Sequence, residues 1–166
     1  MITPEYCRLM ASYNVWQNKS LMGCIKALDE KELTKPRKAF FGSILGTANH
    51  LLWGDLLWMS RFDGGAAPQV TLPESPKLHE AAESYLMDRL RTDKRIIRWA
   101  DKLRHMDLVG PMTWYSSASQ RSLTQQKGVC VTHFFNHQTH HRGQLHAMLT
   151  AAGQSPDVTD LIFMPE

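Results

Sequence analysis

The chain has 166 residues, of which 43% are hydrophobic and 21% charged, and its formal net charge is +3 at pH 7. This length predicts one domain, 1–166, with a sizeable core, and the composition excludes an intrinsically disordered chain. The basic residues are dispersed and no long apolar run occurs, so we expect no nucleic acid and no membrane among its partners. The N-terminus does not resemble a signal peptide, which favours a cytoplasmic protein. Cys7, Cys24 and Cys130 are too few for a disulfide framework, and we expect them to be buried thiols.

The first half of the chain predicts two helices. Thr3 as an N-cap and Pro4 at the first helical position favour a helix start, and apolar residues then recur at helical spacing. This helix is expected to fade in the charged segment 29–32, and 33–38 reads as a turn. A second helix is predicted from about Lys38 to Phe62, and it is apolar around almost its whole circumference.

A linker rich in proline and glycine is predicted next, at 63–76. It is long for a compact domain and could run the length of the molecule. Ser75 and Pro76 repeat the cap-and-proline pattern and predict the start of a third helix, which continues to about His105. The charged run RTDKR at 91–95 within it is predicted to be a solvated face.

The segment 106–126 alternates poorly and is rich in serine, so it predicts either a short hairpin or an irregular loop. Ser122, with Gln125 three residues later, could form a capping box for a fourth helix. That helix is predicted over 128–153. Four long helices without a substantial sheet predict an all-α fold, a four-helix bundle with a long crossover between helices 2 and 3.

Two glycines and the tail complete this prediction. Gly143 inside the fourth helix suggests close approach of another backbone, and Gly153 is expected to end the helix. The tail is predicted to pack through Leu161, Ile162 and Phe163.

The fourth helix carries five of the eight histidines. Because an α-helix turns by about 100° per residue, His137 and His141 fall inside its apolar stripe. His133 and His140 fall at the edge of the stripe, and His146 points away. Two imidazoles one turn apart on a buried stripe have the spacing of a helical metal-binding pair. The alternative is that both are hydrogen-bonded core histidines.

A third ligand for this pair must come from another helix. His79 and His105 lie among charged residues, which predicts that both are solvated. His50 lies in the most apolar helix of the chain and could face the pair across the core. We therefore predict that His50 and the pair bind one divalent ion. Adding His133 to the pair instead is less favoured, because the outer members of that trio are separated by about 12 Å of helix rise.

Several segments resemble the DinB-like (damage-inducible) family of the DinB/YfiT superfamily of metalloenzymes. They are YNVWQN at 13–18, FFGSILGTANHLLWGD at 40–55, FNHQTHHRGQ at 135–144 and TAAGQSPDVTDLIF at 150–163. The resemblance implies a four-helix bundle with a long crossover after the second helix, usually as a homodimer. It also implies a divalent metal, zinc or nickel, held by His50, His137 and His141.

The function expected from these residues is that of a metal-dependent enzyme. Three imidazoles leave one coordination position open, and an ion held in this way can lower the pKa of bound water or hold a thiolate. Relatives in the superfamily include thiol-dependent transferases and an isomerase, so the resemblance implies a transferase that uses a low-molecular-weight thiol. The alternatives are a metal-dependent hydrolase and a non-catalytic metal-binding stress-response protein. No catalytic residue is assigned; Asp55 or Gln144 could orient a ligand.

A homodimer is also predicted from the second helix itself, because a single four-helix core cannot cover all of its apolar faces. The expected interface includes five residues on one arc of this helix: Phe41, Leu45, Leu52, Leu56 and Met59.

Overall fold

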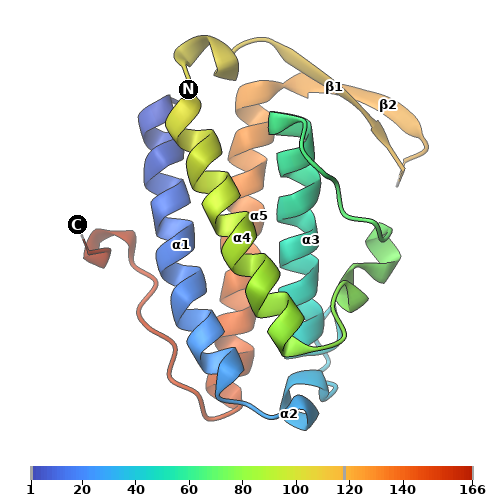
Figure 1. Ribbon diagram of the computed structural model, residues 1–166, viewed down its shortest axis with the longest axis vertical. Helices are drawn as coiled ribbons and strands as arrows, with labels where there is room; N and C mark the ends of the chain where they lie inside the picture. Colours follow the sequence, from blue (N-terminus) through green and yellow to red (C-terminus); the bar gives the residue numbers. More distant parts are fainter. Residues whose placement is uncertain (1, 118, 166) are drawn as a thin grey trace.

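The computed structural model describes residues 2–117 and 119–165, and it is mostly helical with one small two-stranded sheet. Figure 1 shows the long helices side by side, with a hairpin projecting at one end. The long helices are α1 (Pro4–Lys26), α3 (Ile44–Asp63), α4 (Ala82–Lys102) and α5 (Lys127–Ala151). The shorter elements are α2 (Glu30–Thr34), η1 (Leu72–Lys77), η2 (His105–Leu108), β1 (Pro111–Ser116), β2 (Arg121–Gln126) and η3 (Leu161–Phe163). None of the described helices is long and apolar enough to cross a membrane.

The start of α1 is the one predicted. The Thr3 hydroxyl accepts a hydrogen bond from the backbone N–H of Tyr6, and Pro4 occupies the first helical position. The helix ends at Lys26, before the charged segment. That segment begins the short helix α2, which was not predicted and which Asp29 caps through the N–H of Glu32.

The start of α3 lies later than predicted, at Ile44 rather than near Lys38. Residues 38–43 form a tight turn in which Lys38 has a positive φ of 55°. Ser43 then caps α3, because its hydroxyl accepts a hydrogen bond from the N–H of Gly46. The turn matters for the site, because it brings Phe41 back against α3.

The start of α4 was also predicted too early. Ser75 and Pro76 belong to η1, and α4 begins only at Ala82, with Ala81 as N-cap and no side-chain capping bond. The Ser75 hydroxyl contacts His50 instead of capping a helix. In Figure 1, α3 and α4 run in the same direction, so the connection 64–81 returns along the length of α3.

The hairpin alternative for 106–126 is confirmed. β1 and β2 pair antiparallel, with Trp114 opposite Leu123. The predicted capping box is wrong, because Ser122 and Gln125 lie within β2 and α5 begins at Lys127 without a side-chain cap. Strand pairing uses the backbone groups that a capping box would have to contact.

The apolar circumference of α3 is covered by other elements of the same chain. It packs against α4, α5, α2 and η1. Consequently Leu45, Leu52 and Met59 are buried in the core, and Phe41 and Leu56 are half-buried. The predicted dimer arc is therefore not an exposed patch, because α2 and η1 supply the cover that four helices alone would lack.

The glycine predictions have opposite outcomes. Gly153 ends α5 with a φ of 81°, as predicted. Gly143 has no neighbouring atom within 4 Å of an added Cβ, so the expected close approach is absent there. The close approach occurs instead at Gly54, beside the ring of His137.

The tail does not pack in the way predicted, because Leu161, Ile162 and Phe163 are all exposed. It is attached through its backbone: the side chains of Tyr13 and Gln17 donate hydrogen bonds to tail carbonyls. The three cysteines are free and buried, as expected.

Candidate metal centre

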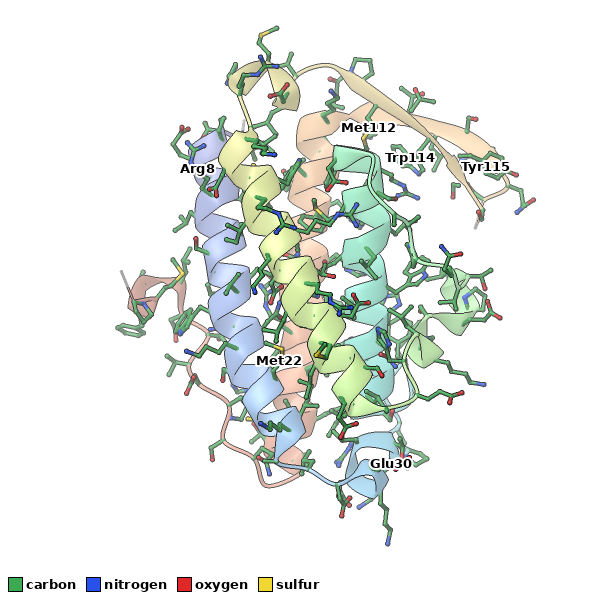
Figure 2. All side chains as sticks on the ribbon, viewed as in Figure 1. Arg8, Met22, Glu30, Met112, Trp114 and Tyr115 are labelled. Atoms are coloured by element: carbon green, nitrogen blue, oxygen red, sulfur yellow. The ribbon has the colours of Figure 1, made fainter. Side chains whose placement is uncertain are left out.

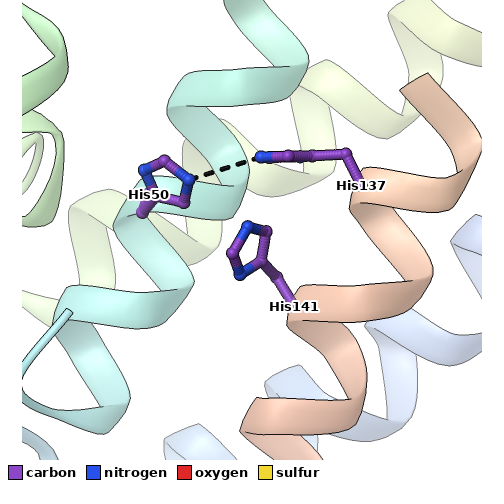
Figure 3. A group of neighbouring side chains, drawn as sticks. All are labelled: His50, His137 and His141. Atoms are coloured by element: carbon purple, nitrogen blue, oxygen red, sulfur yellow. Dashed lines mark hydrogen bonds between the residues drawn. The ribbon is translucent and has the colours of Figure 1, made fainter. Parts of the chain in front are cut away.

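The packing of α3 against α5 brings three histidines together. Figure 3 shows His50 on α3 pointing toward His137 and His141, which lie one turn apart on α5. Each ring offers one nitrogen, and these three nitrogens all lie within 4.8 Å of one another. The Nε2 atoms of His50 and His137 are 3.3 Å apart. A tetrahedral zinc site with bonds of about 2.1 Å separates its donors by roughly 3.4 Å, so this pair already has the spacing of two ligands.

Hydrogen bonds at the far side of two rings define which nitrogen faces the centre. His141 Nδ1 lies 2.8 Å from the side-chain oxygen of Gln144, and His50 Nδ1 lies 2.9 Å from the hydroxyl of Ser75. A carboxamide oxygen only accepts, so the Nδ1 of His141 carries the proton and its Nε2 keeps a lone pair. Both rings are therefore oriented with Nε2 toward the centre, as metal-ligating histidines are in known sites.

The third ring depends on a glycine. A Cβ at Gly54 would lie 2.6 Å from Cε1 of His137, far inside van der Waals contact. The absence of a side chain on this turn of α3 therefore gives the His137 ring its place between the two helices.

Aromatic side chains enclose the histidines. Phe41 stacks on His50 with ring centroids 3.6 Å apart, and it meets His141 edge-on at 5.4 Å. Trp53 stacks with His50 at 6.0 Å, and its indole N–H donates to the carbonyl of Val70 in the linker. These rings exclude water from one side of the cluster and lower the local dielectric.

The three rings are neutral at pH 7. Burial lowers the pKa of His50 to about 4, and the positive charge of a protonated His141 would lower it further. Burial also lowers the pKa of His137 to about 3, with smaller contributions from the neighbouring histidines. The pKa of His141 is lowered by burial too, although its bond to Gln144 opposes this. A neutral imidazole has the free lone pair that a metal ligand requires.

The remaining histidines do not converge on this centre in the described chain. His133 is exposed and packs on Trp58, so the alternative trio does not form. His140 is exposed and contacts Gln144, while the ring of His146 faces the backbone carbonyl of Asp157.

The two histidines expected to be solvated differ from each other. His105 is exposed, as predicted. His79 is half-buried and pairs with Asp88 at 3.1 Å.

The two candidate orienting residues have different roles. Gln144 contacts His141, as considered from the sequence. Asp55 contacts none of the three rings; it accepts hydrogen bonds from Arg89 at 2.7 Å and from Gln138 at 3.0 Å. Sequence reasoning missed Ser75, because its pattern also fits a helix start and nothing local shows that the linker folds back onto α3.

The donor set fits one divalent transition metal. Three neutral imidazoles suit zinc, nickel and similar ions, and a set of three leaves room for a further ligand. The convergence of the donors, their protonation state and the two outer hydrogen bonds agree with such a site.

Two comparisons with known proteins identify the family of the chain. The sequence profile of the DinB family matches residues 1–166. The chain is also 26% identical over 161 residues to Protein DinB of Bacillus subtilis strain 168, covering 94% of this chain and 91% of that protein. The range matched by the family profile includes the positions of all three histidines. The chain belongs to the DinB family.

Proposed function

We propose that His50, His137 and His141 bind one divalent ion, zinc or nickel, and that the protein is a metal-dependent enzyme of the thiol-transferase type. The observation that carries the metal proposal is the convergence of three neutral imidazoles, two of them fixed from behind by Ser75 and Gln144. Such outer hydrogen bonds usually accompany metal-ligating histidines.

The surrounding residues have distinct tasks in this proposal. Ser75 and Gln144 hold the rings of His50 and His141 in one orientation, so little ordering is needed when a metal binds. Phe41 and Trp53 exclude water from the side of His50. When bound, a divalent ion would supply a Lewis acid able to hold a small thiol as its thiolate or to activate water.

Two further proposals concern the fold and assembly. We propose that the four long helices form a four-helix bundle in which the connection 64–81 is the long crossover, as the packing pairs and the parallel course of α3 and α4 support. A homodimer, a low-molecular-weight thiol as partner and a cytoplasmic location remain proposals. Because the predicted arc on α3 is covered within the chain, we propose that the dimer surface includes exposed apolar side chains such as Phe40 and Ile162 instead.

The metal proposal is tested by loading purified protein with zinc or nickel and measuring bound metal after desalting. We expect one ion per chain in the wild type and loss of most of it in His137→Ala. The matched control is His146→Ala, which removes a histidine of the same helix that faces away from the centre. Full retention of metal by a His50→Ala, His137→Ala double variant would contradict the assignment.

The transferase proposal is tested with a panel of small thiols and a chlorinated nitroaromatic electrophile. In this reaction the thiol sulfur bonds to the ring carbon, chloride leaves, and the thiol proton passes to solvent. We expect metal-loaded wild type to exceed His141→Ala in rate with at least one thiol. If wild type and His141→Ala react at equal rates with every thiol, the hydrolase or the non-catalytic metal-binding alternative is favoured instead.

A further inference from the structure

A second candidate site lies at the hairpin end of the molecule. A cavity of about 710 Å³ is lined by the C-terminal parts of α3 and α4, by η2, by the start of α5 and by strand β1. None of the three histidines of the metal centre lines it. Arg61 lines the cavity, and it follows His50 by eleven residues on α3, which corresponds to about 16 Å of helix rise. The volume is within the usual range for small-molecule sites.

One part of the cavity wall is apolar. Phe62 and Trp99 stack nearly parallel, with ring centroids 5.2 Å apart and planes at 14°. Val131 and Leu108 extend this surface, and Met112 contributes from β1. Figure 2 labels Met112 on the hairpin beside the end of α3. Such a wall suits a flat apolar body.

The remainder of the wall is strongly basic. Arg95 is already neutralised, because it binds both carboxylate oxygens of Asp63 at 2.8 and 2.6 Å. The carboxylate of Asp107 pairs with Arg104, outside the lining. Four lining cations have no carboxylate within ion-pair distance in the described chain: Arg61, Arg98, Lys102 and Lys127. Their charges focus a positive potential in a hollow with an apolar wall.

Arg61 is held in position rather than free. Its guanidinium lies 4.5 Å from the ring centroid of Trp58 and 5.2 Å from that of Trp114, so two indoles from α3 and β1 flank it. Burial lowers the pKa of Arg61, but a guanidinium remains charged at neutral pH. A planar guanidinium fixed in this way loses little freedom when it binds a carboxylate or phosphate oxygen.

We propose that this cavity binds a small organic anion, with a carboxylate, sulfonate or phosphate-ester head against the cations and an aromatic body against Phe62 and Trp99. Four unpaired cations beside stacked aromatic rings provide both halves of such recognition. The proposal goes beyond the metal-dependent function and does not depend on it.

The test uses zinc-loaded protein and a fluorescent probe, 8-anilinonaphthalene-1-sulfonate. Its uncharged counterpart, N-phenyl-1-naphthylamine, has the same ring system without the anionic head. We expect the sulfonate to bind at least about tenfold more tightly than the neutral probe, since each charge-assisted hydrogen bond contributes roughly such a factor. Added salt should weaken the binding of the sulfonate probe but not that of the neutral probe. Phenyl phosphate or benzoate should displace the sulfonate probe.

The matched variants lie on one helix. Arg98→Gln, Lys102→Gln removes two exposed cations of the cavity, and Arg91→Gln, Lys94→Gln removes the same charge from α4 outside it. We expect about tenfold weaker sulfonate binding in the first double variant and no change in the second. Metal-free wild-type protein should bind the probe as zinc-loaded protein does, which separates this site from the metal centre. Equal affinity for both probes, or equal loss in both double variants, would overturn the proposal.

Discussion

The histidine centre between α3 and α5 lies beside a buried ion network that joins α3 to α4 and α1, yet the histidines are neutral and the network is charged. His50 and Asp55 are five residues apart on α3, and His137 adjoins Gln138 on α5. The histidines are neutral at pH 7, because burial lowers their pKa values. One turn away, fully buried aspartate and arginine side chains form ion pairs.

The network is built around Arg89 of α4, which is 0% exposed. Its guanidinium lies 2.7 Å from Asp55 and 2.8 Å from Asp93, and Asn18 of α1 donates a further bond to Asp93. Burial acts to lower the pKa of Arg89, but the carboxylates of Asp93 and Asp55 raise it above its ordinary value. The arginine therefore stays charged within the protein core.

A second buried arginine extends the network toward the metal centre. Arg142 of α5 donates to the side-chain oxygen of Asn14 and lies over the ring of Tyr13. Burial lowers its pKa to about 10, so it also remains charged at neutral pH. Asp55 meanwhile accepts a bond from Gln138, which joins α3 to α5 beside His137.

The difference between the two regions lies in their partners rather than in their depth. Burial removes the charge of a side chain that has no opposite charge in direct contact, and it leaves ion pairs charged. The neutral imidazoles are thereby free to bind a cation. The nearby carboxylate of Asp55 is committed to Arg89, so it holds the helices together and does not serve as a ligand.

The largest effect is expected from Arg89→Met, which leaves Asp55 and Asp93 buried without their counter-ion. Removing one partner of a buried pair costs about 3–5 kcal/mol. We expect a loss of this size in the free energy of unfolding of metal-free protein, measured by urea denaturation. The matched control is Arg8→Met, which breaks the exposed pair with Glu5 and should cost far less, because solvent screens this pair. Similar losses in both variants would show that the network contributes no more than a surface pair.

The next effect is expected from Gly54→Ala, which acts on the metal centre. The new methyl group would overlap the His137 ring, and such overpacking costs about 1–3 kcal/mol. We expect zinc affinity, measured by calorimetry, to fall by a corresponding factor. Gly143→Ala is the control, because its Cβ meets no atom and alanine favours the helix by about 1 kcal/mol. Unchanged zinc affinity in Gly54→Ala would contradict the role given to this glycine.

A somewhat smaller effect is expected from Gln144→Ala, which removes the acceptor behind His141. Loss of such an outer hydrogen bond typically lowers metal affinity by about 10–100-fold. The control is His140→Ala, which removes the other partner of Gln144 and leaves the bond to His141 in place. A competition titration with a zinc chelator measures both. Equal affinities for the two variants would mean that Gln144 does not orient the ligand.

The three histidines could be brought together from sequence because helical periodicity determines which side chains share a face. His137 and His141 are one turn apart on the apolar stripe of α5, and His50 lies in the most apolar helix. A helix start is a local property in the same way, and Thr3 and Pro4 were interpreted correctly.

What the sequence did not reveal depends on contacts between distant segments. Ser75 faces His50 only because the linker folds back along α3. The run at 91–95 was interpreted as a solvated face, yet Thr92 and Asp93 are buried. Arg89 and Asn18 provide partners for Asp93 that no local pattern identifies.

A pH series distinguishes the neutral histidines from the charged ion network. His50 and His137 have a pKa of about 4 and about 3 in the folded protein and an ordinary value of 6.5. Below about pH 6.5 the unfolded chain therefore binds protons that the folded chain does not, so acid favours unfolding. We expect the free energy of unfolding of metal-free protein to fall from about pH 7 to about pH 4, and to fall less in a His50→Gln, His137→Gln variant. The surface carboxylates titrate equally in both proteins, so the difference between the two urea-denaturation series reports the histidines alone. Parallel slopes would show that these rings are not held neutral by the fold.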